Sequence, residues 1–258
     1  MTNKESLQPT EKSTSISNSS NKYKGESKMN TNRKTARIVG VLYIIGTVAG
    51  ILSLVFSEPI RNAQDYLIKV SANENQWIMG ALFILIMGLA LAMVPVMMFP
   101  ILRKYNEALA LGYVVFRGGL EAVTYIALTI SWLLLLPLSQ VHVQAGAPDT
   151  SDIQALGNLL LNTDEIGSIL TIVFCLGALM FYYALYQSKL IPRWLSGWGL
   201  IAAIPYLATG LLDMFALISP LSTIGSVLQF PLALQEMVLA VWLIVKGFNP
   251  SAIASEPA

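Results

Sequence analysis

Charged side chains are scarce in this sequence. Lys, Arg, Asp and Glu make up 12% of its 258 residues, whereas a typical soluble domain has about 25%. The formal net charge is only +1, so the chain lacks the basic excess that nucleic-acid binding requires. We therefore expect neither a water-soluble domain nor a nucleic-acid partner.

Cysteine and histidine occur once each. Cys175 alone cannot form an intrachain disulfide, and its apolar neighbours indicate a small buried hydrophobe. His142 has no His, Cys or acidic cluster at ligand spacing, so we predict no metal site and no cofactor. The sequence also contains no HExxH, no GxSxG and no Gly-rich phosphate loop. No catalytic residue is assigned, and the sequence favours a protein that is not an enzyme.

Long apolar runs dominate the rest of the chain. Hydrophobic residues make up 55% of it, and the mean hydropathy is +0.61. About 20 apolar residues suffice to cross a bilayer. Such runs lie at 38–56, 77–102, 109–136, 162–186, 195–217 and 225–245. The sequence predicts an all-α polytopic bundle of six transmembrane helices with the lipid bilayer as its partner.

The segment before the first run is polar. Residues 1–32 are rich in Ser, Thr, Asn, Lys and Glu, and such a composition cannot bury enough apolar surface to offset its ordering entropy. We therefore divide the chain into a disordered cytoplasmic tail (1–34), a transmembrane domain (35–248) and a short C-terminal tail (249–258). Met29 would itself make a natural start, which leaves open whether residues 1–28 belong to the native protein.

Two connections are longer than the others. Residues 57–76 place apolar side chains at helical spacing, which indicates a short interfacial amphipathic helix; a solvated loop is the alternative. The third span is expected to close at Pro137, and residues 138–163 are then the longest loop.

The basic residues predict the orientation of the bundle. On one side of the six spans lie Arg33, Lys34, Arg37, Arg103, Lys104, Lys189, Arg193 and Lys246, and on the other only Arg61 and Lys69. Lysines and arginines in short loops mark the cytoplasmic side. We expect a multi-pass protein of the cell membrane with both termini in the cytoplasm.

Ionisable residues inside the spans are the candidate site. Arg117 and Glu121 lie four residues apart in the third span, and Glu236 lies near mid-depth in the sixth. Each costs about 2.5–3.5 kcal/mol at the centre of a helix facing lipid, so they should face protein or water. We predict that the three meet in one cluster, which carries a net −1 unless one glutamate is protonated. Secondary candidates are Gln229, Tyr125 and Asp213.

Three functions are compatible with this cluster. A buried Arg–Glu pair can fix the helices of a scaffold or accessory subunit, and this is the interpretation that the residues favour. The same carboxylates could serve a transporter of a small solute, an ion or protons. A membrane enzyme acting on lipid is the third. A second copy of the chain or another membrane protein as partner is left open.

Several segments resemble one known family. They are RIVGVLYIIGTVAGI, ALGYVVFRGGLEAV, SKLIPRWLSGWGLI and PLALQEMVLAVWLIVKGF, and with them residues from about 35 to 248 resemble the domain-of-unknown-function family numbered 4386. The resemblance implies a prokaryotic multi-pass membrane protein without an assigned activity. The family pattern includes residues that match Arg117, Glu121, Glu236, Lys246 and Gly247. The extension before Met29 departs from it.

Overall fold

The computed structural model describes residues 11–145, 151–162, 164–220 and 222–254. Within these residues the chain is helical and has no strand. The elements are α1 (Glu11–Arg61), α2 (Tyr66–Ala72), α3 (Glu74–Leu102), α4 (Glu107–Tyr113), the π-helix η1 (Val114–Leu120), α5 (Glu121–Ala145), α6 (Ser151–Leu161), α7 (Asp164–Ser188), α8 (Arg193–Met214), α9 (Thr223–Val245) and α10 (Pro250–Ala254).

Six stretches of the described chain are long and apolar enough to cross a membrane, which confirms the predicted fold class. They are Thr31–Arg61, Glu74–Leu102, Glu107–Gln144, Ser151–Ser188, Arg193–Met214 and Thr223–Val245. Large apolar side chains such as Val55, Ile201 and Phe230 point outward from them. An apolar outer surface is what a lipid environment requires, and the protein is an integral membrane protein.

The predicted boundary at Pro137 is wrong. Helix α5 continues through Pro137 to Ala145, and α6 occupies most of the remaining residues of the expected loop. Pro137 removes the backbone donor that would otherwise bond the Leu133 carbonyl, and membrane helices tolerate this loss where neighbouring helices pack against them. Beside the proline, the Ser139 hydroxyl donates to the Leu136 carbonyl at 2.7 Å. The Ser131 hydroxyl donates to the Leu160 carbonyl at 2.8 Å and joins α6 to α5.

Of the two alternatives for residues 57–76, the helical one is confirmed. The first span extends past Pro59 to Arg61, and the short α2 then buries Tyr66, Leu67 and Val70. The Tyr66 hydroxyl donates to the Asn158 side chain of α6 at 3.0 Å. Helices α2 and α6 therefore pack together at one end of the bundle.

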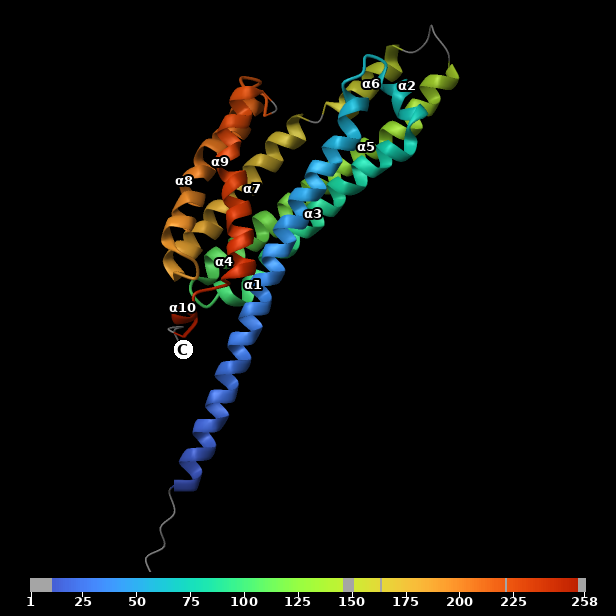
Figure 1. Ribbon diagram of the computed structural model, residues 1–258. Coiled ribbons are helices and arrows are strands. Elements are labelled where there is room, and N and C mark those ends of the chain that lie inside the picture. The colour runs from blue at the N-terminus through green and yellow to red at the C-terminus, as the bar shows by residue number, and fades with distance from the viewer. Residues whose placement is uncertain (1–10, 146–150, 163, 221, 255–258) are drawn as a thin grey trace, which may run out of the picture.

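The helices form two groups (Figure 1). One contains α1, α3 and α5 with α2 and α6, and the other contains α7, α8 and α9. The groups meet where α1 packs against α9 and where α7 packs against η1 and α5. In Figure 1 they lie together at the lower end and diverge toward the upper end.

Glycines allow α1 and α3 to approach closely. A Cβ atom at Gly46 would lie 2.8 Å from the Leu91 side chain, and one at Gly50 would lie 2.7 Å from the sulfur of Met87. This spacing of small residues, four apart, is a common contact in membrane helices. It brings one wall of the candidate site into place.

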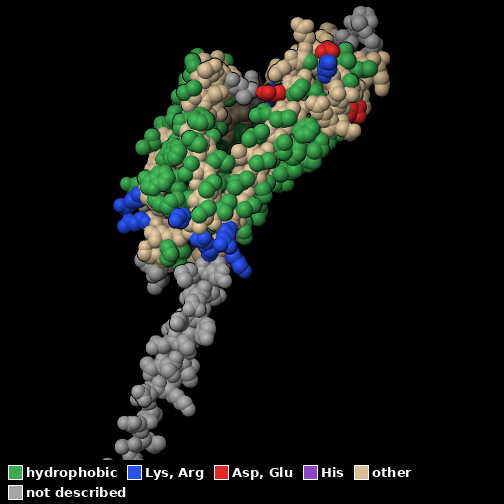
Figure 2. Space-filling model, in the orientation of Figure 1, with side chains coloured by type: hydrophobic (Ala, Val, Ile, Leu, Met, Phe, Trp, Pro, Cys, Tyr) green, Lys and Arg blue, Asp and Glu red, His purple; other side chains and the backbone are tan. Residues whose placement is uncertain are grey.

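The end of the bundle where the groups meet carries most of the basic residues (Figure 2). There Arg33 donates through Nη2 to the Val245 carbonyl at 2.6 Å and through Nη1 to the Lys246 carbonyl, so it caps α9. Gly247 ends that helix with a φ of 73°, a conformation that glycine adopts without strain. At the same end the Tyr105 hydroxyl donates to the Ala252 carbonyl of α10 at 3.0 Å.

The predicted domain boundaries stay predictions. Residues 1–10 of the expected tail lie outside the described residues, and α1 begins at Glu11. In the expected C-terminal tail, residues 250–254 form α10, and residues 255–258 lie outside the described residues.

Candidate functional site

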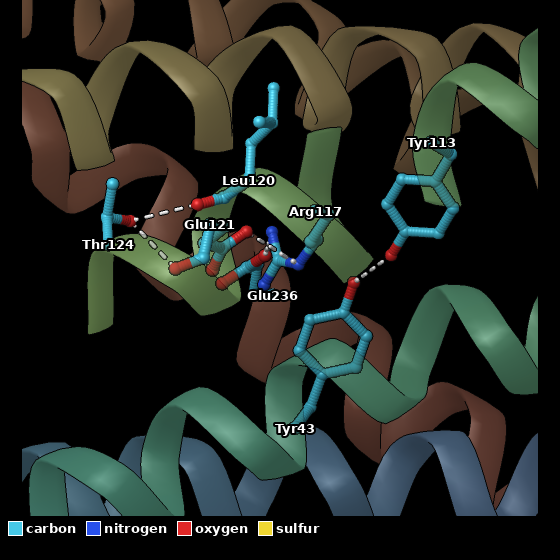
Figure 3. A network of polar contacts seen from close by, with 7 residues as sticks. All are labelled: Tyr43, Tyr113, Arg117, Leu120, Glu121, Thr124 and Glu236. Carbon is cyan, nitrogen blue, oxygen red and sulfur yellow. Dashed lines mark hydrogen bonds and ion pairs between the residues drawn. The ribbon is translucent and has the colours of Figure 1, made fainter. Parts of the chain in front are cut away.

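The structure brings the three intramembrane ionisable residues together (Figure 3). Arg117 of η1 and Glu121 of α5 are each 1% exposed, and Glu236 of α9 is 15% exposed. Nη1 of Arg117 lies 3.1 Å from Oε1 of Glu236, and its Nε lies 3.7 Å from Oε2 of Glu121. We call these three residues the Arg–Glu cluster. Whether it binds a ligand or only fixes helices stays a prediction.

A π-helix positions Arg117. The seven residues of η1 interrupt the α-helical run between α4 and α5, and π turns inside α-helices often mark functional sites. Gly177 of α7 lies so close to this segment that a Cβ there would be 3.2 Å from both the backbone nitrogen and Cβ of Arg117. The missing side chain lets α7 press against η1, and this contact directs the guanidinium into the bundle.

Aromatic rings cover the guanidinium. Cζ of Arg117 lies 4.6 Å from the ring centre of Phe174 in α7 and 5.4 Å from that of Tyr43 in α1. A cation is attracted to the face of an aromatic ring within about 6 Å. Arg117 therefore contacts α1, α5, α7 and α9, and it joins the two groups of helices.

A cavity of about 270 Å³ adjoins the cluster. At about 30 Å³ for each water in the liquid, that is room for roughly nine waters or one small solute. It lies between the two groups of helices, and Figure 2 shows the molecule hollowed there, away from the main group of lysines and arginines. Its lining consists of Gly46, Thr47, Met87, Leu91, Arg117, Glu121, Tyr125, Leu170, Thr171, Phe174, Tyr206, Ala233 and Glu236.

A layer of aromatic side chains closes the cavity toward the basic end. We define the aromatic layer as Tyr43, Tyr113, Phe181 and Tyr182, each at most 1% exposed. The ring centres of Tyr113 and Phe181 are 4.5 Å apart, those of Phe181 and Tyr182 are 5.3 Å apart, and the hydroxyls of Tyr43 and Tyr113 are 3.5 Å apart.

The order of residues along three helices shows that this layer lies between the basic end and the cavity. In α1, Tyr43 lies between Arg37 and the cavity residue Gly46. From α4 into η1, Tyr113 lies between the loop containing Lys104 and Arg117. Phe181 and Tyr182 of α7 likewise precede the basic loop after α7 and follow the cavity residues of that helix. The aromatic layer thus lies between the cavity and the basic end.

Polar atoms of the cluster retain unused hydrogen-bonding capacity. Among the described residues, neither oxygen of the Glu121 carboxylate has a hydrogen-bond partner, and the same holds for Nε and Nη2 of Arg117. Buried polar atoms in folded proteins are rarely left in this condition. The arrangement can therefore accept a donor at Glu121 and present a donor from Arg117.

Of the three secondary candidates, one lies at the cavity and two do not. Tyr125 is buried and lines the cavity. Gln229 and Asp213 do not line it: the Gln229 amide donates to the Pro220 carbonyl at 3.2 Å, and Asp213 accepts from the Ser168 hydroxyl at 2.6 Å. Both lie beyond the cavity on the side away from the aromatic layer.

Sequence reasoning missed part of the lining. Thr47, Thr171 and Tyr206 are polar residues inside apolar spans, and this was an available signal for them. Phe174 gives no such signal, because an aromatic residue is ordinary in a membrane helix. Its role depends on the neighbouring Arg117, which only the packed bundle reveals.

Comparison with known proteins gives one result on the family and none on activity. No curated protein and no solved structure matches the chain. The model of the family described as Domain of unknown function (DUF4386) matches residues 38–247. This match covers five of the six apolar stretches in full, the first from residue 38, and every residue of the Arg–Glu cluster. The chain therefore belongs to the DUF4386 family.

Proposed function

We propose that this protein is a transporter of a small solute and that the cavity beside the Arg–Glu cluster is its binding site. The observation that carries the proposal is the cavity itself, about 270 Å³ and lined by Arg117, Glu121 and Glu236. Transporters bind their substrates near the middle of the bilayer, between groups of helices. The position between the two helix groups fits that arrangement.

The scaffold interpretation explains less of the geometry. It accounts for Arg117, which contacts helices of both groups. It gives no reason for a cavity at the cluster or for the Glu121 oxygens that lack hydrogen-bond partners among the described residues. An ion pair that serves only to fix helices is most favourable when packing and hydrogen bonds complete it.

The closed and open sides suggest a direction of access. We place the protein in the cell membrane with both termini in the cytoplasm, as the basic residues predict. The cavity then opens toward the outside, and the aromatic layer is the cytoplasmic barrier. Release to the cytoplasm requires the rings of Tyr113 and Phe181 to separate.

Flux through proteoliposomes tests the proposal. The full chain is reconstituted and assayed with isobutylamine, isobutanol, isobutyrate, sodium, potassium and a proton gradient. We expect flux of at least one of these above the level of empty liposomes. The control is the double variant Arg117→Met, Glu121→Leu, which removes one opposite pair of charges and should stay folded. If no compound of the panel shows more flux than empty liposomes, the transporter proposal is overturned and the scaffold interpretation takes its place.

Thiol labelling tests the side of access separately. Cys175 is the single native cysteine and is buried, so Cys175→Ala gives a background without thiols. We expect a membrane-impermeant cationic methanethiosulfonate to label Thr47→Cys in the cavity from outside, and to leave Ala178→Cys in the closed core unlabelled. Labelling of Thr47→Cys from the cytoplasmic side alone would reverse the orientation.

A further inference from the structure

The two glutamates of the cluster are not equivalent. Glu236 lies at 3.1 Å from Arg117, whereas the closest approach of Glu121 is 3.7 Å. Among the described residues, both oxygens of Glu121 lack hydrogen-bond partners, whereas only Oε1 of Glu236 does. The side chain of Glu121 is also 1% exposed, whereas that of Glu236 is 15% exposed. Glu236 is thus the closer ion-pair partner of Arg117, and Glu121 is the carboxylate with the larger unused hydrogen-bonding capacity.

The lining of the cavity is one positive charge short. Arg117 balances one carboxylate, and none of the other described residues that line the cavity is Lys, Arg or His. With both glutamates ionised, the site carries a net −1. A ligand with a single positive charge would neutralise it without leaving a buried charge unpaired.

The walls suit an organic cation better than a metal ion. The rings of Phe174 and Tyr206 meet edge to face at 5.2 Å between their centres, and Tyr125 lines the same cavity. Aromatic faces attract ammonium groups, and the side chains of Met87 and Leu170 offer apolar contact to an alkyl group. The described residues contain no group of three or more His, Cys, Asp or Glu that could hold a metal ion.

We infer that the cavity binds a small primary ammonium ion, a protonated alkylamine, and that Glu121 is the residue that accepts its hydrogen bonds. This inference rests on the proposed function and specifies its substrate class. Arg117 with Glu236 then serves as the fixed part of the site, and Glu121 is the part that the ligand completes.

Ligands of equal shape test the charge. Full-length protein in nanodiscs is titrated with isobutylamine, isobutanol and isobutyrate at one pH and one ionic strength, and binding is measured by calorimetry. We expect isobutylamine to bind at least tenfold more tightly than the other two. Tighter binding of isobutanol or isobutyrate would overturn the cation assignment and leave the transporter proposal standing. An absence of binding by all three would overturn the inference, whereas the flux panel decides the transporter proposal independently.

Two charge-matched double variants test Glu121. Arg117→Gln with Glu236→Gln keeps Glu121 as the one carboxylate of the cluster, and Arg117→Gln with Glu121→Gln keeps Glu236, so the cluster has a net −1 in both. We expect the first to retain isobutylamine binding and the second to lose at least tenfold. Equal binding by the two would show that charge alone matters and would remove Glu121 from its role. Glu107→Gln, at an exposed residue of the basic end, should bind like the natural chain.

Size-exclusion chromatography and circular dichroism verify that each variant is folded. If either double variant fails to fold, the single variant Glu121→Asp decides the question, because it keeps the charge and withdraws the carboxylate by one methylene. We expect at least a fivefold loss of isobutylamine affinity. An unchanged affinity would overturn the role of Glu121.

Discussion

The two ends of the bundle differ in how they are packed. At the basic end the side chains of the aromatic layer are buried, Arg33 caps the last span, and α10 is hydrogen-bonded to the chain before α4. At the opposite end the two helix groups diverge, and the cavity lies between them. One end is thus built as a continuous core, and the other holds a cavity lined by polar side chains. The comparison teaches that the same six helices can combine a closely packed half with a half that contains a polar cavity.

The largest effect should come from the residue at the boundary between the two halves. Arg117→Met leaves Glu121 and Glu236 as buried carboxylates without a partner, and breaking a buried pair in this way costs about 3–5 kcal/mol of unfolding free energy. Adding Glu121→Leu should recover only part of that loss, because Glu236 still lacks its ion-pair partner. Unfolding in mixed micelles measures both. Equal stability of Arg117→Met and the natural chain would show that the cluster is not a charge-paired part of the core.

An intermediate effect should separate Gly199 of α8 from Gly167 of α7. At the packed end, a Cβ at Gly199 would lie 2.5 Å from the Tyr182 ring, which the aromatic layer holds in place. Overpacking of this kind costs about 1–3 kcal/mol, which we expect for Gly199→Ala.

At the open end, a Cβ at Gly167 of α7 would meet no atom within 4 Å. The Gly167→Ala variant should therefore change stability by less than about 1 kcal/mol. Thermal unfolding of both variants in the same detergent compares them. A larger loss for Gly167→Ala than for Gly199→Ala would contradict the division into a packed and an open half.

The smallest effect is expected inside the aromatic layer. Tyr113→Phe removes a hydroxyl whose contact with the Tyr43 hydroxyl is long, at 3.5 Å, and keeps the ring stacked on Phe181. A hydrogen bond contributes about 0.5–1.5 kcal/mol, and this one should lie at the lower limit. The same unfolding assay checks it. A loss of several kcal/mol would mean that the hydroxyl pair, and not ring packing, seals this end.

The sequence predicts the spans well because hydropathy depends on each segment alone. Arg117, Glu121 and Glu236 could be named for the same reason, since an ionisable residue in an apolar run is visible without the fold. The aromatic layer could not be predicted: Tyr43 and Tyr113 are seventy residues apart in the chain, and nothing in either segment indicates the other. The continuation of α5 through Pro137 was also hidden, because a proline by itself favours a helix end, whereas the contact of α5 with α6 through Ser131 and Leu160 appears only in the packed bundle.

The capping of α9 by Arg33 makes neighbours of the first and last membrane spans. Each spanning helix packs against the next around the bundle, in the order α1, α3, α5, α7, α8 and α9, and α9 packs against α1. The transmembrane domain is therefore a closed ring of helices, and Arg33 adds a hydrogen bond between its first and last members. The residue that makes this hydrogen bond, Arg33, lies after Met29. A chain that begins at Met29 would therefore keep the bond between the first and last spans, and only a truncation beyond position 33 would remove it.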